Sequence, residues 1–388
     1  MLRRTVCVLL VLLAGGGAAA AKNGGRPPFS WATVPVYIHL GKSSGPLTKQ
    51  ELHFIARTSN FVCLEKGHGL RRFGSTEKGI AHDARLLKAL NNKMKVLFYW
   101  NGFLNYPLYD ACKEFRRHPD WIFRDKQGKP IYKVQALQQY NLLNADFRRW
   151  WASIAGKALR QYGCDGIFMD ALLQTRSPKW MKRGWGEGNE RLVTQAVTDM
   201  MQLARKAMGD DAILLYNGLR SSDRGGGMRG GEFLPHADGA AVEHFGAFRS
   251  RSRESIVRDI EAIIRAGKAG KIVVVKGWPD PQFNWLNRAK MMLPARQLVA
   301  EARDKIAFPL ACFLVAAQKD SYFCYSWGYR EQHGSLVEYP EFQKPLGEPK
   351  GDAARNGWIY NRSFEHVDVQ VDVSRRVARL DWKDKDGQ

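Results

Sequence analysis

Two acidic residues each stand at the end of a short apolar run. Asp170 ends the run 165–170, and Glu243 lies in the run 240–245. Cleavage of a glycosidic bond needs an ionised carboxylate against the anomeric carbon and a protonated acid beside the leaving oxygen. We therefore interpret Asp170 as a nucleophile, or as a base if the reaction inverts, and Glu243 as a general acid/base. The alternatives are a helix cap or ion pair for Asp170 and a pairing with arginine for Glu243.

Other apolar runs end in polar and aromatic residues that suit a sugar. Aromatic rings can stack on the apolar face of a pyranose, while amides and acids bond its hydroxyl groups. Packing is the alternative for each tryptophan, and a core position is the alternative for His39. The predicted substrate-binding residues are His39, Glu65, Trp100, Asn101, Asn217, His244, Trp278 and Trp327, with Glu65 as the reserve acid.

The runs that carry these residues alternate with helical periodicity. Eight strands are predicted, at 35–40, 61–65, 95–101, 165–170, 212–217, 240–245, 271–276 and 322–326. Helices are predicted at 48–58, 82–92, 146–162, 189–208, 254–266 and 296–317. Eight strands alternating with helices predict an α/β fold, a (β/α)₈ TIM barrel, whose chemistry lies at the carboxyl ends of the strands. A doubly wound open sheet is the alternative, against which the count of eight strands speaks.

The two ends of the chain differ from this alternating pattern. Arg3 and Arg4 precede an apolar run and a small-residue zone, so residues 1–21 are predicted to be a signal peptide. A retained anchor is the alternative. The predicted catalytic barrel covers residues 30–334, and residues 335–388 alternate as a small C-terminal β-appendage. We expect a secreted or periplasmic protein with no membrane span after removal of the signal.

The amino-acid composition limits the classes of molecule that the protein is expected to bind. Lysine and arginine total 60 against 38 acidic residues, a formal charge of +22. This charge fits a basic surface or attraction to an anionic polysaccharide, and it would also attract nucleic acid. No nucleic-acid motif is present, so we predict a carbohydrate partner and no nucleic acid. Five cysteines follow the signal, an odd number that leaves at least one thiol free. None has the spacing of a metal site, so no metal and no cofactor are predicted.

The stretch 146–170, DFRRWWASIAGKALRQYGCDGIFMD, carries a family resemblance. It resembles the fourth-strand region of glycoside hydrolase-like barrels of the α-galactosidase type, and more narrowly the hypothetical glycosyl hydrolase family 15. Residues 95–101, 141–146, 215–218, 240–245 and 338–382 extend the resemblance over most of the chain. It implies a nucleophilic aspartate after strand four and an acid/base after strand six, which correspond to Asp170 and Glu243. It also implies a retaining reaction, with the two carboxyl groups about 5–6 Å apart.

Three classes of function remain open from the sequence. The first is a secreted retaining glycosidase acting on an oligo- or polysaccharide. The second is a barrel that binds carbohydrate or cell wall without turnover, which loss of either carboxylate would have favoured. The third is a secreted hydrolase or lyase that acts on a substrate other than sugar.

Overall fold

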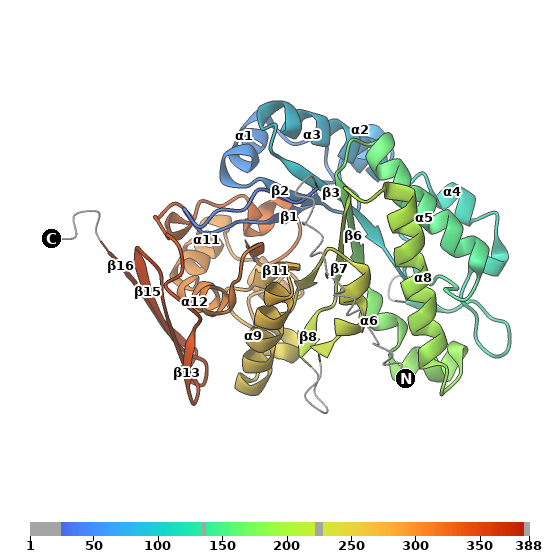
Figure 1. The fold of residues 1–388 in the computed structure, drawn as a ribbon. Coiled ribbons are helices and arrows are strands. Elements are labelled where there is room, and N and C mark those ends of the chain that lie inside the picture. The colour runs from blue at the N-terminus through green and yellow to red at the C-terminus, as the bar shows by residue number, and fades with distance from the viewer. Residues whose placement is uncertain (1–24, 134–136, 222–227, 384–388) are drawn as a thin grey trace, which may run out of the picture.

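A computed structural model describes residues 25–133, 137–221 and 228–383 of the chain (Figure 1). The predicted signal peptide, 1–21, lies outside these residues. Within the described part of the chain, no helix has the length and apolar character needed to cross a membrane.

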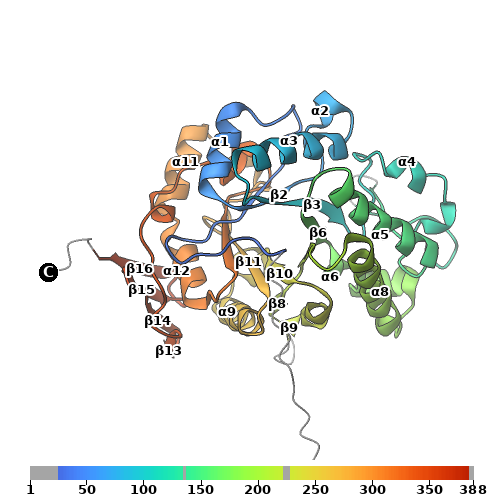
Figure 2. The same ribbon diagram turned by 45° about the horizontal axis from the view of Figure 1, so that its top comes forward.

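Eight parallel strands form the central sheet, which confirms the predicted barrel class (Figures 1 and 2). They follow one another around the sheet in chain order, so each strand pairs with the barrel strand that comes next in the sequence. The strands are β1 (Ile38–Leu40), β2 (Phe61–Leu64), β3 (Lys95–Asn101), β6 (Gly166–Asp170), β7 (Ile213–Asn217), β10 (Gly239–Val242), β11 (Ile272–Gly277) and β12 (Ser321–Tyr325).

The first and last strands meet and close the barrel. Val36, just ahead of β1, pairs in parallel with Phe323 of β12. The backbone N–H of Tyr37 donates to the carbonyl of Phe323 at 2.8 Å, and the N–H of Phe323 donates to the carbonyl of Pro35 at 2.7 Å. Because both edges of the sheet are paired with each other, the doubly wound open sheet is excluded.

Helices connect the strands and cover the outside of the barrel (Figure 2). Their starts follow from capping residues: Thr48 accepts from the N–H of Glu51 in a capping box, and Asn144 accepts from the N–H of Phe147. The longer helices are α1 (Lys49–Thr58), α3 (Thr76–Leu90), α5 (Ala145–Arg160), α8 (Glu190–Met208), α9 (Arg253–Lys268), α11 (Ala295–Asp304) and α12 (Ala307–Ala316). The short ones are α2 (Leu70–Phe73), α4 (Cys112–Phe115), α6 (Leu172–Thr175), α7 (Pro178–Trp180) and α10 (Arg288–Met291).

The single helix predicted at 296–317 is wrong, because α11 ends at Asp304 and α12 begins at Ala307. The cause is Pro309. In a continuous helix its missing N–H would leave the carbonyl of Lys305 without a partner, and its ring would clash with that carbonyl. In the first turn of a new helix the N–H has no intrahelical partner to lose, so the chain restarts there.

Side chains alternate along each strand between the barrel interior and the helical layer. Tyr37, Cys63, Phe168, Leu215 and Val274 belong to an inner cluster of buried residues, separate from the larger cluster under the helices. Residues two positions further along a strand face the same side. The interior therefore continues, toward the carboxyl ends of the strands, with His39, Glu65, Asp170, Asn217 and Lys276.

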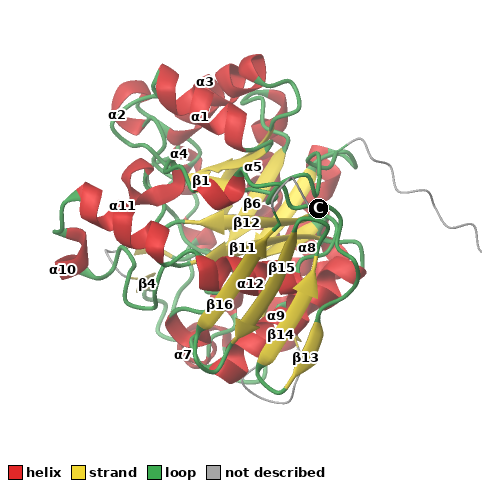
Figure 3. Ribbon diagram, turned by 90° about the vertical axis from the view of Figure 1, so that its left-hand side faces the viewer, coloured by secondary structure: helices red, strands yellow, loops and turns green. Residues whose placement is uncertain are grey.

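A four-stranded antiparallel sheet follows the barrel and confirms the predicted β-appendage. Its strands are β13 (Ala354–Asn356), β14 (Ile359–Ser363), β15 (Val367–Asp372) and β16 (Val377–Trp382). The sheet packs against α12, as Figure 3 shows from the side of the molecule that carries it. Two short hairpins complete the described strands, β4 (Tyr132–Lys133) with β5 (Leu137–Gln138) and β8 (Arg220–Ser221) with β9 (Met228–Arg229).

Candidate active site

One amide group holds the two predicted carboxylates together. Asn217 Nδ2, at the end of β7, donates to Asp170 Oδ1 and to Glu243 Oε2, each at 2.8 Å. The reverse orientation of the amide would set its oxygen against both carboxylates, so the observed orientation is the favourable one. The two acceptor oxygens are at most twice 2.8 Å apart. The angle between two N–H bonds of one amide makes this separation roughly 5 Å.

Donors surround both oxygens of Asp170, the last residue of β6. Oδ2 accepts from the Tyr99 hydroxyl at 2.5 Å and from Asn101 Nδ2 at 3.3 Å. Besides Asn217, Oδ1 accepts from the N–H of Ala171 at 2.6 Å. Ala171 has a φ of 71°, a left-handed conformation that costs a non-glycine residue about 1–3 kcal/mol and clusters at functional sites.

Glu243 follows directly after β10 and receives fewer hydrogen bonds. The Tyr329 hydroxyl donates to Oε1, and Asn217 donates to Oε2. Oε2 also lies 3.4 Å from His244 Nε2 and 3.9 Å from Arg220 Nη2. Since Arg220 donates to His244 Nδ1 at 2.8 Å, the neutral imidazole carries its hydrogen on Nε2, toward Glu243.

Burial and charge act on the two carboxyl groups in different ways. Burial raises the pKa of Asp170, and the charge of Glu243 raises it further. Burial alone would raise the pKa of Glu243, but His244, the Tyr329 hydroxyl and Arg220 outweigh it and lower the pKa to about 2. Burial also lowers the pKa of His244 to about 4, so at pH 7 the imidazole is neutral and exerts no charge on Glu243. At neutral pH the charge of His244 therefore does not favour the ionised form of Glu243.

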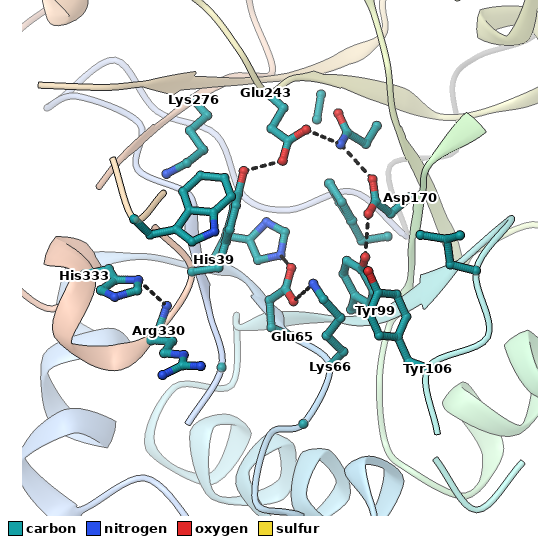
Figure 4. A pocket seen from close by; sticks show the side chains of 18 of the residues that line it. His39, Glu65, Lys66, Tyr99, Tyr106, Asp170, Glu243, Lys276, Arg330 and His333 are labelled. Carbon is teal, nitrogen blue, oxygen red and sulfur yellow. Dashed lines mark hydrogen bonds and ion pairs between the residues drawn. The ribbon is translucent and has the colours of Figure 1, made fainter. Parts of the chain in front are cut away.

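A third carboxylate, Glu65, lies in the same cavity but is paired with a lysine and a histidine (Figure 4). Its Oε2 is 2.5 Å from Lys66 Nζ, and its Oε1 is 3.1 Å from His39 Nε2. Burial would raise the pKa of Glu65, but these two partners outweigh it and lower the pKa. Lys66 Nζ also lies 4.3 Å from the centre of the Tyr99 ring. Glu65 therefore anchors Lys66 beside the tyrosine that donates to Asp170.

Lys276, at the end of β11, is a buried cation that lines the cavity. Its Nζ donates to the hydroxyl and the carbonyl of Ser326 and lies 4.2 Å from the Trp278 ring centre. Within the described residues it forms no ion pair with a carboxylate, and burial lowers its pKa. A donor that is held by a hydroxyl and aromatic rings can bind an oxygen of a ligand.

These groups line a cavity of about 810 Å³ at the carboxyl ends of the strands. In Figure 4 Glu243 lies beside Lys276 and Asp170 lies beside Tyr99, and the amide of Asn217 donates to both carboxylates. The cavity combines carboxylates, an amide and lysines with aromatic and apolar side chains, a lining that suits a polar ligand with an apolar face. Among the residues that the structure describes, no group of histidine, cysteine and acidic residues could hold a metal ion. The five described cysteines are buried and free.

The structure brings many of the predicted binding residues to this cavity but not all of them. His39, Glu65 and Asn217 line it. Asn101 is buried beside Asp170, and His244 lies beside Glu243.

The three predicted tryptophans lie elsewhere. Trp100 faces the helical layer, where its Nε1 donates to the carbonyl of Trp151, because it alternates with the inward-facing Tyr99 and Asn101. We therefore correct its assignment to packing. Trp278 is buried, and its Nε1 donates to the carbonyl of Glu243 at 2.8 Å, so it supports the backbone of that residue. Trp327 is also buried, and it borders a second cavity.

Sequence reasoning missed several groups that contact the carboxylates. Tyr99 could have been found from strand alternation, since it faces the same side as Asn101. Lys66 adjoins the predicted Glu65, but nothing in the sequence shows that it turns toward Tyr99. Tyr329 reaches Glu243 from the loop after β12 and Arg220 approaches it from β8, and no local pattern reveals such long-range contacts.

Solved structures with this barrel fold include glycoside-acting enzymes. The maltogenic α-amylase AmyB from Thermotoga neapolitana is 12% identical, with a TM-score of 0.51 over 88% of this chain and 86% of that one. An α-amylase from Lactobacillus plantarum is 12% identical, with a TM-score of 0.50 over 88% and 87%. The glycoside hydrolase domain of PelA from Pseudomonas aeruginosa is 16% identical, with a TM-score of 0.48 over 77% and 95%. At these identities the two amylases support the fold alone.

Comparison of the sequence with family models assigns the chain to a family. No curated protein matches the chain in sequence. Residues 88–368, well over half of the chain, match a family that is described as hypothetical glycosyl hydrolase family 15. The matched region includes Asp170, Asn217 and Glu243. The chain belongs to the hypothetical glycosyl hydrolase family 15.

Proposed function

We propose that the protein is a retaining glycoside hydrolase that cleaves an O-glycosidic bond of an oligo- or polysaccharide. The observation that carries this proposal is the shared amide of Asn217, which holds one oxygen of Asp170 and one of Glu243 at 2.8 Å. The resulting separation of roughly 5 Å matches the spacing of retaining enzymes, about 5–5.5 Å. An inverting enzyme needs about 6.5–9.5 Å to admit water between the carboxyl groups.

In the proposed reaction Asp170 is the nucleophile. Its oxygens accept from four donors, which occupy roughly the four lone-pair positions of an ionised carboxylate. A proton on Asp170 would have to displace one of them. Glu243 accepts two hydrogen bonds, and the Tyr329 hydroxyl can turn to accept a proton from it. The number of these hydrogen bonds favours an ionised Asp170 and a protonated Glu243. The raised pKa of Asp170 and the pKa of about 2 of Glu243 act in the opposite direction.

The bond changes follow from these two roles. Asp170 attacks the anomeric carbon while Glu243 gives its proton to the departing oxygen, so an ester forms between the sugar and Asp170. The ionised Glu243 then removes a proton from water, which attacks the same carbon and releases Asp170 as a carboxylate. Two inversions at one carbon give net retention.

We further propose an acidic glycan as the substrate of an exported protein. Lys276 and Arg330 line the cavity, and neither forms an ion pair with a carboxylate in the described part of the chain. The formal charge of the whole chain, +22, would attract the same kind of polymer. The predicted signal peptide supports action outside the cytoplasm.

A substrate screen with stereochemical analysis tests the reaction. The purified protein is assayed with 4-nitrophenyl glycosides of the common pyranoses and with neutral and acidic polysaccharides. Proton NMR then follows the first anomer released from a substrate that is cleaved. We expect the product to keep the anomeric configuration of the substrate. Net inversion would overturn the retaining mechanism, and binding without turnover by the whole panel would favour a carbohydrate-binding barrel.

A further inference from the structure

A second cavity, of about 450 Å³, adjoins the one that holds the carboxylates. The two cavities share Trp285, Arg330 and His333 in their linings, so they are neighbours with a common wall. The lining residues of the second cavity include no acidic side chain. It therefore offers no second pair of catalytic carboxylates, and a role in binding fits it better.

The second cavity is lined by two kinds of side chain. Trp285, Met291, Leu293 and Leu298 provide aromatic and apolar surface, and three residues from the loop after β12 provide polar groups. A pyranose presents an apolar face and an edge of hydroxyl groups, so it needs these two kinds of partner together. The polar residues are Arg330, Gln332 and His333.

The shared Trp285 is fixed in place and is linked to the carboxylate pair. Its backbone N–H donates to the carbonyl of Trp327 at 2.8 Å, and its ring stacks on Trp278 with centres 5.4 Å apart. The Trp285 ring also meets the ring of Tyr329 at 5.2 Å, and the hydroxyl of Tyr329 donates to Glu243. A ligand beside Trp285 would therefore lie next to the site of bond cleavage.

We propose that the second cavity is a further sugar-binding subsite, so that the protein acts on a glycan chain that occupies both cavities. This inference rests on the proposed glycoside hydrolase function. The unit beside Trp285 supplies binding energy from a part of the substrate that does not itself react, which raises the rate for long substrates over short ones.

A blocking variant tests the subsite without touching the carboxylates. Ala295, the first residue of α11, is exposed and lines only the second of these two cavities, so Ala295→Trp fills that cavity without disturbing the core. Ala300 is exposed on the same helix and lines neither cavity, so Ala300→Trp is the matched control. Gln332→Ala, with the exposed Gln343→Ala as its control, removes a polar group from the second cavity. Thermal unfolding of each variant checks the fold.

The readout is kcat/KM on a 4-nitrophenyl monoglycoside compared with an oligosaccharide series of the same sugar, from disaccharide to hexasaccharide. Glucose, galactose, N-acetylglucosamine, N-acetylgalactosamine and galacturonate series are used. We expect Ala295→Trp to lower the ratio of hexasaccharide to monoglycoside activity by at least about tenfold, and Ala300→Trp to leave it unchanged. An unchanged ratio in Ala295→Trp would overturn the subsite even if both substrates are cleaved.

A binding measurement separates failure of the subsite from failure of the proposed function. If the wild-type protein cleaves none of these substrates, the proposed function fails, and calorimetric titration with the same hexasaccharides still tests the subsite. Tighter binding of a hexasaccharide by the wild type than by Ala295→Trp supports the subsite. Equal binding by the two proteins, or no binding by either, overturns it.

Discussion

At the scale of single residues, Asn217 has the largest influence on the proposed chemistry. Two carboxylates at roughly 5 Å repel each other in a buried site, and the donor shared between them offsets part of that repulsion. Asn217 also fixes the separation on which the proposed retention depends. It is a positioning residue for both acids, whatever sugar lies between them.

Asn217→Ala should therefore slow the reaction and shift its pH dependence. Loss of the N–H group removes a hydrogen bond from each ionised carboxylate, so the pKa values of both groups rise. The acid limb of the kcat/KM profile, which reports ionisation of the nucleophile, should move to higher pH, and kcat should fall about 100-fold. Asn284→Ala removes another buried amide, one that bonds only its own turn, and should leave the acid limb in place. An unshifted limb in Asn217→Ala would show that the amide does not set the ionisation of the pair.

The roles of the two acids predict different responses to the leaving group. Glu243→Gln removes the proton donor, so its loss of kcat should shrink on dinitrophenyl glycosides, whose leaving group needs little protonation. Asp170→Asn removes the nucleophile, so its loss of several orders of magnitude should persist on every substrate. Both comparisons are made with circular dichroism as a check of the fold. If dinitrophenyl glycosides restored the activity of Asp170→Asn and not that of Glu243→Gln, the two roles would be reversed.

At the scale of elements, the positions of the strands could be predicted from the sequence. The side of the strand that each residue faces could also be predicted, and for Trp100 the prediction did not take it into account. The eight apolar runs, with Asp170 and Asn217 at strand ends, predicted the barrel and the face that carries the site. Period-two alternation places Trp100 opposite to Asn101, so the same rule excludes Trp100 from the cavity. The contact of Tyr329 with Glu243 joins residues from different loops, and only the closed barrel brings them together. Such contacts depend on tertiary structure, which no local pattern encodes.

The packing of the C-terminal sheet on α12 predicts a role in stability. Arg362 of β14 is 5% exposed, and it donates to the carbonyls of Leu314 and Ala317 at the end of α12 and to that of Gly351. Burial lowers its pKa to about 10, so it stays charged at neutral pH. Arg362→Met should leave these carbonyls without their donor and reduce the free energy of unfolding by about 3 kcal/mol.

Denaturant unfolding of two variants in the same sheet checks this role. Arg379 of β16 has a side chain that is 75% exposed and pairs with Asp381, so Arg379→Met should change the free energy of unfolding by less than about 0.5 kcal/mol. Equal effects of the two substitutions would mean that Arg362 does not anchor the sheet to the barrel.

At the scale of the whole molecule, the excess of positive charge predicts salt-sensitive binding of acidic polymers. With a formal charge of +22, and with Lys276 and Arg330 at the cavity, the protein should bind polygalacturonate more tightly than dextran at low salt. Raising NaCl from about 0.05 M to about 0.5 M should weaken polygalacturonate binding at least about fivefold, because screening shortens the range of the attraction. Calorimetric titration measures both effects. Salt-independent binding, or equal affinity for the two polymers, would contradict an acidic substrate.

The central claim is that Asp170 forms a covalent bond with the sugar while Glu243 acts as acid and base. Trapping with a 2-deoxy-2-fluoro glycosyl fluoride of the sugar found in the substrate screen tests it most directly, since the fluorine slows hydrolysis of the glycosyl-enzyme ester. After digestion, mass spectrometry locates the labelled peptide. We predict one sugar per protein molecule, attached to Asp170 and absent from Asp170→Asn. A label on Glu243 would show that the roles are reversed, and turnover of the reagent without a covalent label, with inversion of its product, would contradict the retaining mechanism.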